Sequence, residues 1–292
     1  MESNKVIYKS VSIDTETIFY RKAGKESSPT ILLLHGFPSS SHMFRELIPI
    51  LAHDYHVIAP DLIGFGESSH RSHKEFEYTF DNLAYYINLF IQQLSLNKFA
   101  LYVFDYGAPV GFRLAMANPE KITGIISQNG NAYEEGLSEG WNPIMKYWKE
   151  RTAENRNALL SFLTAETTQW QYTYGVDNVE LVSPDGYNSD QFFLNREGSD
   201  DIQLDLFGDY KNNVALYPDF QKYFRTYQPP LLAVWGKNDP FFLPEGAEAY
   251  KKDIPNALIK LYDTGHFALE THLNEISIEI LSFLQNIYRK EF

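Results

Sequence analysis

The most constraining feature of the sequence is a series of short apolar runs, each ending on a turn-forming or polar residue, that alternate with helix-like segments. The runs are TILLLHG (30–36), HVIAPD (56–61), FALYVFD (99–105), ITGIISQN (122–129), PPLLAVWG (229–236) and ALIKLYD (257–263). Strands that are apolar throughout need both faces covered, and helices between them favour parallel pairing. The chain is therefore predicted to form an α/β fold with a mostly parallel sheet covered by helices on both faces.

Other segments fill in this plan. The runs VIYKSVSI (6–13) and TIFYRKAG (17–24) alternate like paired strands. Helices are predicted within 39–53, 79–96 and 108–119, and an amphipathic helix over 274–290. Thr79 and Asp81 fit the capped start of the second of these helices.

Residues 131–224 break the alternation. This stretch has helix-like pieces with few strand signals, and it holds three of the four tryptophans (Trp141, Trp148, Trp170) and eight tyrosines. We interpret it as a helical cap inserted into one α/β core. The predicted domains are a core of 1–130 and 225–292 and a cap of 131–224.

Composition excludes several classes of function. A net charge of −13 without a Lys/Arg cluster argues against a nucleic-acid partner. The absence of cysteine excludes disulfides and thiolate chemistry. No apolar run approaches the ~20 residues of a membrane span, and no secretory signal is recognisable. We therefore expect a cytoplasmic protein, monomer or homodimer, that acts on a small molecule without a cofactor.

The histidines offer one possible metal cluster. His53, His56, His70 and His73 lie near one another in the sequence, but their spacing matches no metal-binding motif, and we expect them at the surface.

Asp105 is a lone carboxylate at the end of an apolar strand. A helix is predicted to begin nearby at Ala108 and Pro109, and Gly107 permits a tight turn between strand and helix. Strand, nucleophile, turn and helix are the parts of a nucleophile elbow. Alone, Asp105 is equally well explained as a helix N-cap.

Two later strand ends favour the catalytic interpretation. Asp239 follows the strand LLAVWG, and His266 follows IKLYD. Nucleophile, acid and histidine in this order, at one edge of a parallel sheet, can act as a triad. Asp263 is the second candidate for orienting His266, ranked lower because it directly precedes the histidine loop.

The motifs together resemble those of the α/β-hydrolase superfamily over nearly the whole chain. They are HGFP (35–38), DLIGFGES (61–68), the elbow VFDYG (103–107), GKNDP (236–240) and TGHF (264–267). The resemblance implies an eight-stranded sheet with an inserted cap. It also implies an oxyanion hole made by the backbone N–H groups of Phe37 and Tyr106. Gly64 and Gly66 are expected only to shape a loop.

An aspartate at the elbow resembles two groups of this superfamily, the epoxide hydrolases and the haloalkane dehalogenases. A carboxylate attacks sp³ carbon and leaves an alkyl ester, which water activated by His266 then hydrolyses. The epoxide hydrolase pattern implies cap tyrosines as proton donors, and Tyr147 and Tyr210 match it. Opening an epoxide to a vicinal diol is the first expectation.

A haloalkane dehalogenase is the alternative. Val103, two residues before the nucleophile, fits that group, but Tyr106 stands where its halide-binding tryptophan would follow. Trp148 and Trp170 are candidate pocket residues that could donate an indole N–H to a halide. An ester or lactone hydrolase and a non-catalytic ligand-binding homologue of the same fold remain further alternatives.

Overall fold

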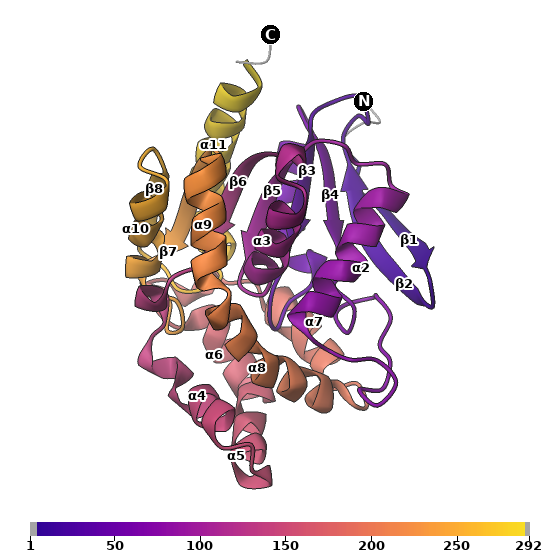
Figure 1. Cartoon of the computed structure of the whole chain (residues 1–292), viewed down its shortest axis with the longest axis vertical. Helices are drawn as coiled ribbons and strands as arrows, with labels where there is room; N and C mark the ends of the chain where they lie inside the picture. The colour runs from indigo at the N-terminus through magenta and orange to yellow at the C-terminus, as the bar shows by residue number, and fades with distance from the viewer. Residues whose placement is uncertain (1–4, 290–292) are drawn as a thin grey trace.

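An eight-stranded sheet forms the centre of the computed structural model, which describes residues 5–289 (Figure 1). The strand order is β1-β2-β4-β3-β5-β6-β7-β8, and β2 pairs antiparallel with both neighbours while β4, β3 and β5 to β8 are parallel. The strands are β1 (Ile7–Ile13), β2 (Glu16–Ala23), β3 (Thr30–Leu34), β4 (His56–Pro60), β5 (Phe99–Phe104), β6 (Ile122–Gln128), β7 (Leu231–Gly236) and β8 (Leu258–Tyr262). The predicted fold class is confirmed.

Two hydrophobic cores cover the two faces of the sheet. In β3, Leu32 and Leu34 pack in the core that includes helices α2, α3 and α10, whereas Ile31 and Leu33 pack in the core with α1 and α11. Side chains of a strand alternate between faces, so a strand with helices on both sides must be apolar at every position. This explains the unbroken apolar runs. The core helices are α1 (Leu47–Leu51), α2 (Phe80–Gln93), α3 (Gly107–Ala117), α10 (Pro244–Asp253) and α11 (Ala268–Tyr288).

Most predicted core helices form, with two differences. The Thr79 side chain caps α2 by accepting a hydrogen bond from the Asn82 N–H, 3.2 Å away. The helix predicted within 39–53 is reduced to a 3₁₀ turn, Ser41–Phe44, and the short α1. Pro49 lies inside α1 and has no N–H to bond back to the preceding turn, so the two pieces do not merge. The C-terminal helix α11 begins earlier than predicted, and Lys290 lies outside the described residues.

The stretch between β6 and β7 is helical. It contains α4 (Asn142–Lys149), α5 (Ala153–Ala158), α6 (Ala165–Thr173), α7 (Pro184–Leu194), α8 (Ser199–Ala215) and α9 (Tyr217–Tyr227). Figure 1 shows α4, α5, α6 and α8 gathered below the sheet, whereas α9 runs beside it. Helix α9 packs against α3 and α10, so the predicted cap boundary at residue 224 falls within a helix that covers the core.

No helix among the described residues is both long enough and apolar enough to cross a membrane.

Candidate active site

Asp105 lies on the sharp turn between β5 and α3. Its φ of 48° is in the left-handed region, which a side chain other than glycine rarely adopts. Two nearby glycines leave room for this turn. A Cβ on Gly107 would lie 2.3 Å from the Leu34 carbonyl oxygen, and one on Gly36 would lie 2.3 Å from the Asp105 Oδ1. The two glycines therefore let the carboxylate approach the loop after β3.

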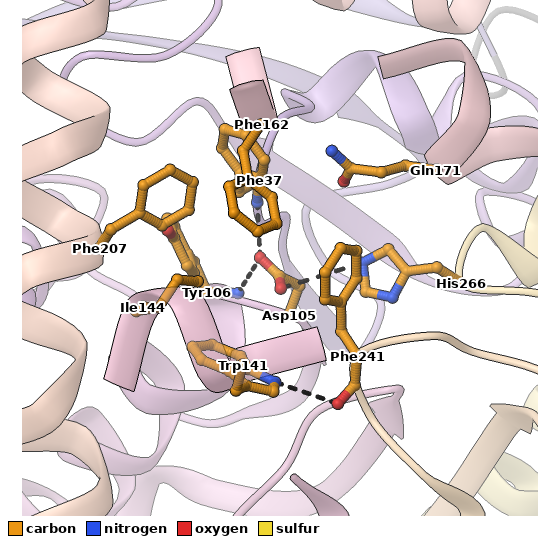
Figure 2. Close-up of a pocket in the computed structure, with 10 residues that line it drawn as sticks. All are labelled: Phe37, Asp105, Tyr106, Trp141, Ile144, Phe162, Gln171, Phe207, Phe241 and His266. Atoms are coloured by element: carbon orange, nitrogen blue, oxygen red, sulfur yellow. Dashed lines mark hydrogen bonds and ion pairs between the residues drawn. The ribbon is translucent and has the colours of Figure 1, made fainter. Parts of the chain in front are cut away.

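The two oxygens of the Asp105 carboxylate have different surroundings. The backbone N–H groups of Phe37 and Tyr106 both donate to Oδ1, each at 2.6 Å. Oδ2 lies 3.9 Å from His266 Nε2, which is longer than a hydrogen bond. Figure 2 shows the carboxylate between these groups. One oxygen is thus held in a pair of N–H donors, and the other has no such bond.

His266 is held from its other side by Asp239. Its Nδ1 lies 2.6 Å from Asp239 Oδ2, inside the protein. Asp239 Oδ1 accepts hydrogen bonds from the N–H groups of Phe241 and Phe242, at 2.8 and 3.1 Å. The geometry fixes the ring with Nε2 toward Asp105, as a general base between nucleophile and orienting acid requires.

Asn129 completes this arrangement and was missed at the level of sequence. It follows β6 with a φ of 44°, and its Nδ2 donates to Asp239 Oδ2 at 2.7 Å. Its amide also exchanges hydrogen bonds with the backbone of Gly236 at the end of β7. The signal was present, because the run ITGIISQN ends on this residue at the same sheet edge.

Asp263 does not contact His266. It is exposed, and its carboxylate pairs with Lys237 Nζ at 3.2 Å and with Asn238 Nδ2 at 2.9 Å. Of the two candidates for orienting His266, Asp239 contacts the histidine and Asp263 does not.

Burial sets the charge states of the pair. It raises the pKa of Asp105 to about 6, although the nearby His266 and the two N–H donors oppose the rise. Burial also acts to lower the pKa of His266, but the charge and hydrogen bond of Asp239 more than offset it, and the pKa lies above the ordinary 6.5. Asp105 is therefore mostly ionised at pH 7.

A small cavity of about 20 Å³ lies against Asp105 (Figure 2). A water molecule needs roughly 10–15 Å³ of such space, so the cavity is nearly filled by its own lining. Apart from Asp105 and His266, the lining is mainly aromatic and aliphatic: Phe37, Tyr106, Trp141, Ile144, Phe162, Gln171, Phe207 and Phe241.

Two polar groups in this lining are buried without a hydrogen-bond partner among residues 5–289. They are the Tyr106 hydroxyl and the Gln171 Nε2. Burial and the nearby Asp105 charge hold the pKa of Tyr106 well above 10, so its hydroxyl stays protonated. Figure 2 shows the Gln171 side chain reaching over His266 with its amide end toward the space above Asp105.

The two tyrosines expected to donate protons do not line this cavity. Tyr147 packs its ring under the Arg151 guanidinium, 4.7 Å from the ring centroid. Tyr210 is fully buried, and its ring packs against Trp141, with the two ring centroids 4.4 Å apart. The cavity lining contains Trp141 and neither Tyr147 nor Tyr210, which differs from the proton donors that the resemblance implies.

The expected tryptophans also lie away from the cavity. The Trp148 Nε1 donates to the Phe207 carbonyl oxygen at 2.7 Å, and Trp170 is 39% exposed. The tryptophan that does line the cavity, Trp141, donates its Nε1 to the Phe241 carbonyl oxygen at 3.0 Å. None of these three places a free indole N–H in the cavity.

The four histidines do not all lie at the surface as expected, because His56 is the buried first residue of β4. His53 pairs with Asp54 and His73 with Asp205, each at 2.9 Å. Among the described residues, no group of three or more His, Cys, Asp or Glu side chains is arranged to hold a metal ion.

Comparisons with known proteins agree with this architecture. Residues 29–273 match the family model described as "alpha/beta hydrolase fold". The chain belongs to the α/β-hydrolase family. It is 49% identical over 278 residues to "Uncharacterized hydrolase YNR064C" of Saccharomyces cerevisiae, which covers 94% of this chain and 95% of the relative. The protein is a hydrolase of this family.

Dehalogenases are among the more distant relatives. A haloalkane dehalogenase of Bradyrhizobium diazoefficiens is 37% identical over 106 residues, which is 36% of this chain and 33% of that protein. The match thus spans about a third of the dehalogenase. A solved mutant of haloalkane dehalogenase DatA from Agrobacterium tumefaciens C58 superposes with a TM-score of 0.81 at 20% identity, covering 98% of this chain and 99% of the other. At that identity the likeness concerns the fold alone.

Proposed function

We propose that this hydrolase acts on small apolar molecules through a covalent alkyl ester on Asp105, and that its first substrate class is epoxides, opened to vicinal diols. The observation that carries the proposal is that the two oxygens of the Asp105 carboxylate have different surroundings. Oδ1 is held by two backbone N–H groups, while Oδ2 is left beside the cavity and His266. A carboxylate in this setting suits attack on sp³ carbon.

In the first step Oδ2 forms a bond to a substrate carbon and the bond from that carbon to the epoxide oxygen breaks. The electron pair of the broken bond goes to the oxygen, which takes the proton of the Tyr106 hydroxyl. The product is a hydroxyalkyl ester of Asp105 and a tyrosinate. The ester carbonyl oxygen is Oδ1, already held by the Phe37 and Tyr106 N–H groups.

In the second step water attacks Cγ of Asp105 and gives a proton to His266 Nε2. Negative charge develops on Oδ1, where the two N–H donors stabilise it. The bond from Cγ to Oδ2 then breaks, the departing oxygen takes the proton from His266, and the diol is released. The carboxylic acid formed at Asp105 gives up the proton that restores the Tyr106 hydroxyl.

The donors of the cavity favour the epoxide. An alkoxide needs a proton, and Tyr106 is a protonated phenol that lines the cavity and has no hydrogen-bond partner among residues 5–289. The indole N–H groups that would bind a halide are engaged by backbone carbonyls, at Trp141 and Trp148. The proton donor is thereby proposed to be Tyr106 in place of the two cap tyrosines.

Haloalkane dehalogenation is the second candidate, favoured by the named dehalogenases among the relatives. A halide leaves as a stable anion and needs only hydrogen-bond donors, so the same Asp105 chemistry serves it. A panel of 1,2-epoxybutane and 1-bromobutane, with diol and bromide measured in parallel, separates the two. Bromide release without diol would overturn the epoxide assignment.

The covalent ester is tested by a single turnover in ¹⁸O-labelled water. Because the released oxygen is Oδ2, the label is expected in the Asp105 carboxylate and not in the first product molecule. In His266→Gln the ester is expected to form and accumulate, visible as a mass increase on the peptide that contains Asp105. Label found only in the product would contradict the mechanism.

A further inference from the structure

Gln171 is the one buried polar side chain of the cavity whose chemistry the proposed function does not use. It lies on α6 and is 1% exposed, and its Nε2 has no hydrogen-bond partner within the described residues. Leaving a buried amide donor unpaired lowers the stability of the fold. The amide end of Gln171 lies in the wall of the cavity (Figure 2), where a bound ligand atom can accept its unpaired N–H.

The position of Gln171 is fixed by the residues around it on α6. The Tyr172 ring stacks on Phe267, with centroids 3.7 Å apart and planes 10° from parallel, and the Tyr172 hydroxyl donates to Asp190 at 2.5 Å. Phe267 directly follows His266 in the chain. Helix α6 is thus packed on the loop that carries His266, and this packing fixes the position of Gln171 relative to that loop.

The rest of the cavity leaves Gln171 few partners. The walls other than Asp105, His266 and Tyr106 are apolar, and the Trp141 N–H is already donated to the Phe241 carbonyl. A primary amide donates two hydrogen bonds and is never charged. It can therefore stabilise an oxygen or halide that gains negative charge, without supplying the proton itself.

We infer that Gln171 binds the atom that leaves the substrate carbon, and that it thereby selects compact apolar substrates with one acceptor at the reacting carbon. This inference rests on the proposed function. While the bond from carbon to the epoxide oxygen or halogen breaks, the leaving atom gains the electron pair. It then accepts a hydrogen bond from the Gln171 N–H. Tyr106 then supplies the proton where the leaving atom is oxygen, and none where it is a halide.

The test compares Gln171→Met, which keeps the size and removes the N–H donors, with Gln169→Met on the exposed side of the same helix. Each change is placed in the wild-type and His266→Gln backgrounds. Ester formation is followed by mass on the peptide containing Asp105, with 1,2-epoxybutane and 1-bromobutane as probes. Ester hydrolysis is followed as decay of the adduct with His266 present.

Gln171→Met is expected to slow ester formation by about 10²-fold, the effect of losing one donor to a developing anion. It is expected to leave ester hydrolysis within about threefold, because the leaving atom has already departed by then. Gln171→Asn, which keeps the amide, should recover part of the rate. Gln169→Met should match the parent in both steps.

Several results overturn the inference. Ester formation in Gln171→Met at the parent rate excludes a role in the leaving step, and equal loss in both steps indicates a structural role. Gln171→Glu serves if the Met variant does not fold, since its ionised carboxylate has no hydrogen to donate. Its rate of ester formation relative to the parent at the same pH should fall as the introduced carboxyl ionises. If neither probe modifies Asp105 in the parent protein, the proposed function fails, and the inference fails with it.

Discussion

Replacing Asp105 with asparagine is expected to make the protein more stable while abolishing its chemistry. The folded structure raises the pKa of this carboxyl from 3.8 to about 6, chiefly through burial. At 1.36 kcal/mol for each pH unit, that interval corresponds to about 3 kcal/mol of cost for holding the charge inside the protein. Asparagine keeps an oxygen for the Phe37 and Tyr106 N–H groups and carries no charge.

The stability difference between wild type and Asp105→Asn is expected to depend on pH. Between pH 3.8 and 6 the folded chain binds more protons at this site than the unfolded chain. The free energy of unfolding of the wild type therefore falls as pH rises through that window, and the variant lacks this decline. The advantage of Asp105→Asn should be near zero below pH 4 and about 3 kcal/mol above pH 6.

Urea unfolding at pH 4 and pH 7.5 measures the difference directly, and thermal melts should show a gain of about 5–10 °C at the higher pH. Asp263→Asn is the matched control, because that carboxylate is exposed and paired with Lys237 and Asn238. It should not gain stability. Intact mass must confirm the variant, since water activated by His266 can hydrolyse the new amide back to aspartate. Equal stability of Asp105→Asn and wild type at pH 7.5 would refute the reasoning.

Three further outcomes are expected. The rate of ester formation should rise with pH through about 6 and then level, because Asp105 attacks only when ionised; a flat profile from pH 5 to 8 in quenched-flow measurements would contradict this. Asn129→Ala removes a hydrogen bond to the charged Asp239, worth about 1.5–3 kcal/mol, so ester hydrolysis should slow by about 10–100-fold; unchanged decay of the adduct would assign Asn129 to the fold alone. Tyr106→Phe should lower epoxide opening by about 10²–10⁴-fold, the usual range for a general acid, while Tyr210→Phe stays near wild type; the reverse order in a diol assay would return the proton donor to the cap.

The parts of the site that could be predicted from sequence are those fixed by the sheet. Asp105, Asp239 and His266 each follow a strand of the parallel part of the sheet, and the carboxyl ends of parallel strands meet at one edge. Their proximity follows from that rule once the strands are recognised. The N–H donors of Phe37 and Tyr106 could be predicted only from the resemblance of HGFP and VFDYG to the α/β-hydrolase motifs.

The cap residues could not be predicted in the same way. Whether Tyr147 or Tyr210 faces the cavity depends on how the cap helices pack. The sequence does not distinguish a tyrosine that packs in the core from one that donates a proton. Trp141 lines the cavity, whereas Tyr210 packs against Trp141 and does not line it. Gln171 gave no signal, since a single glutamine in a polar helix is ordinarily solvated.

The stacking of Tyr172 on Phe267 has a consequence for engineering. These rings belong to segments far apart in the sequence, one in an inserted helix and one directly after His266, yet their centroids lie 3.7 Å apart. A chimera that grafts the cap of a relative onto this core would lose the stacking of Tyr172 on Phe267. Modular exchange of specificity in this hydrolase therefore has to carry the loop after β8 together with α6, as one transferable unit.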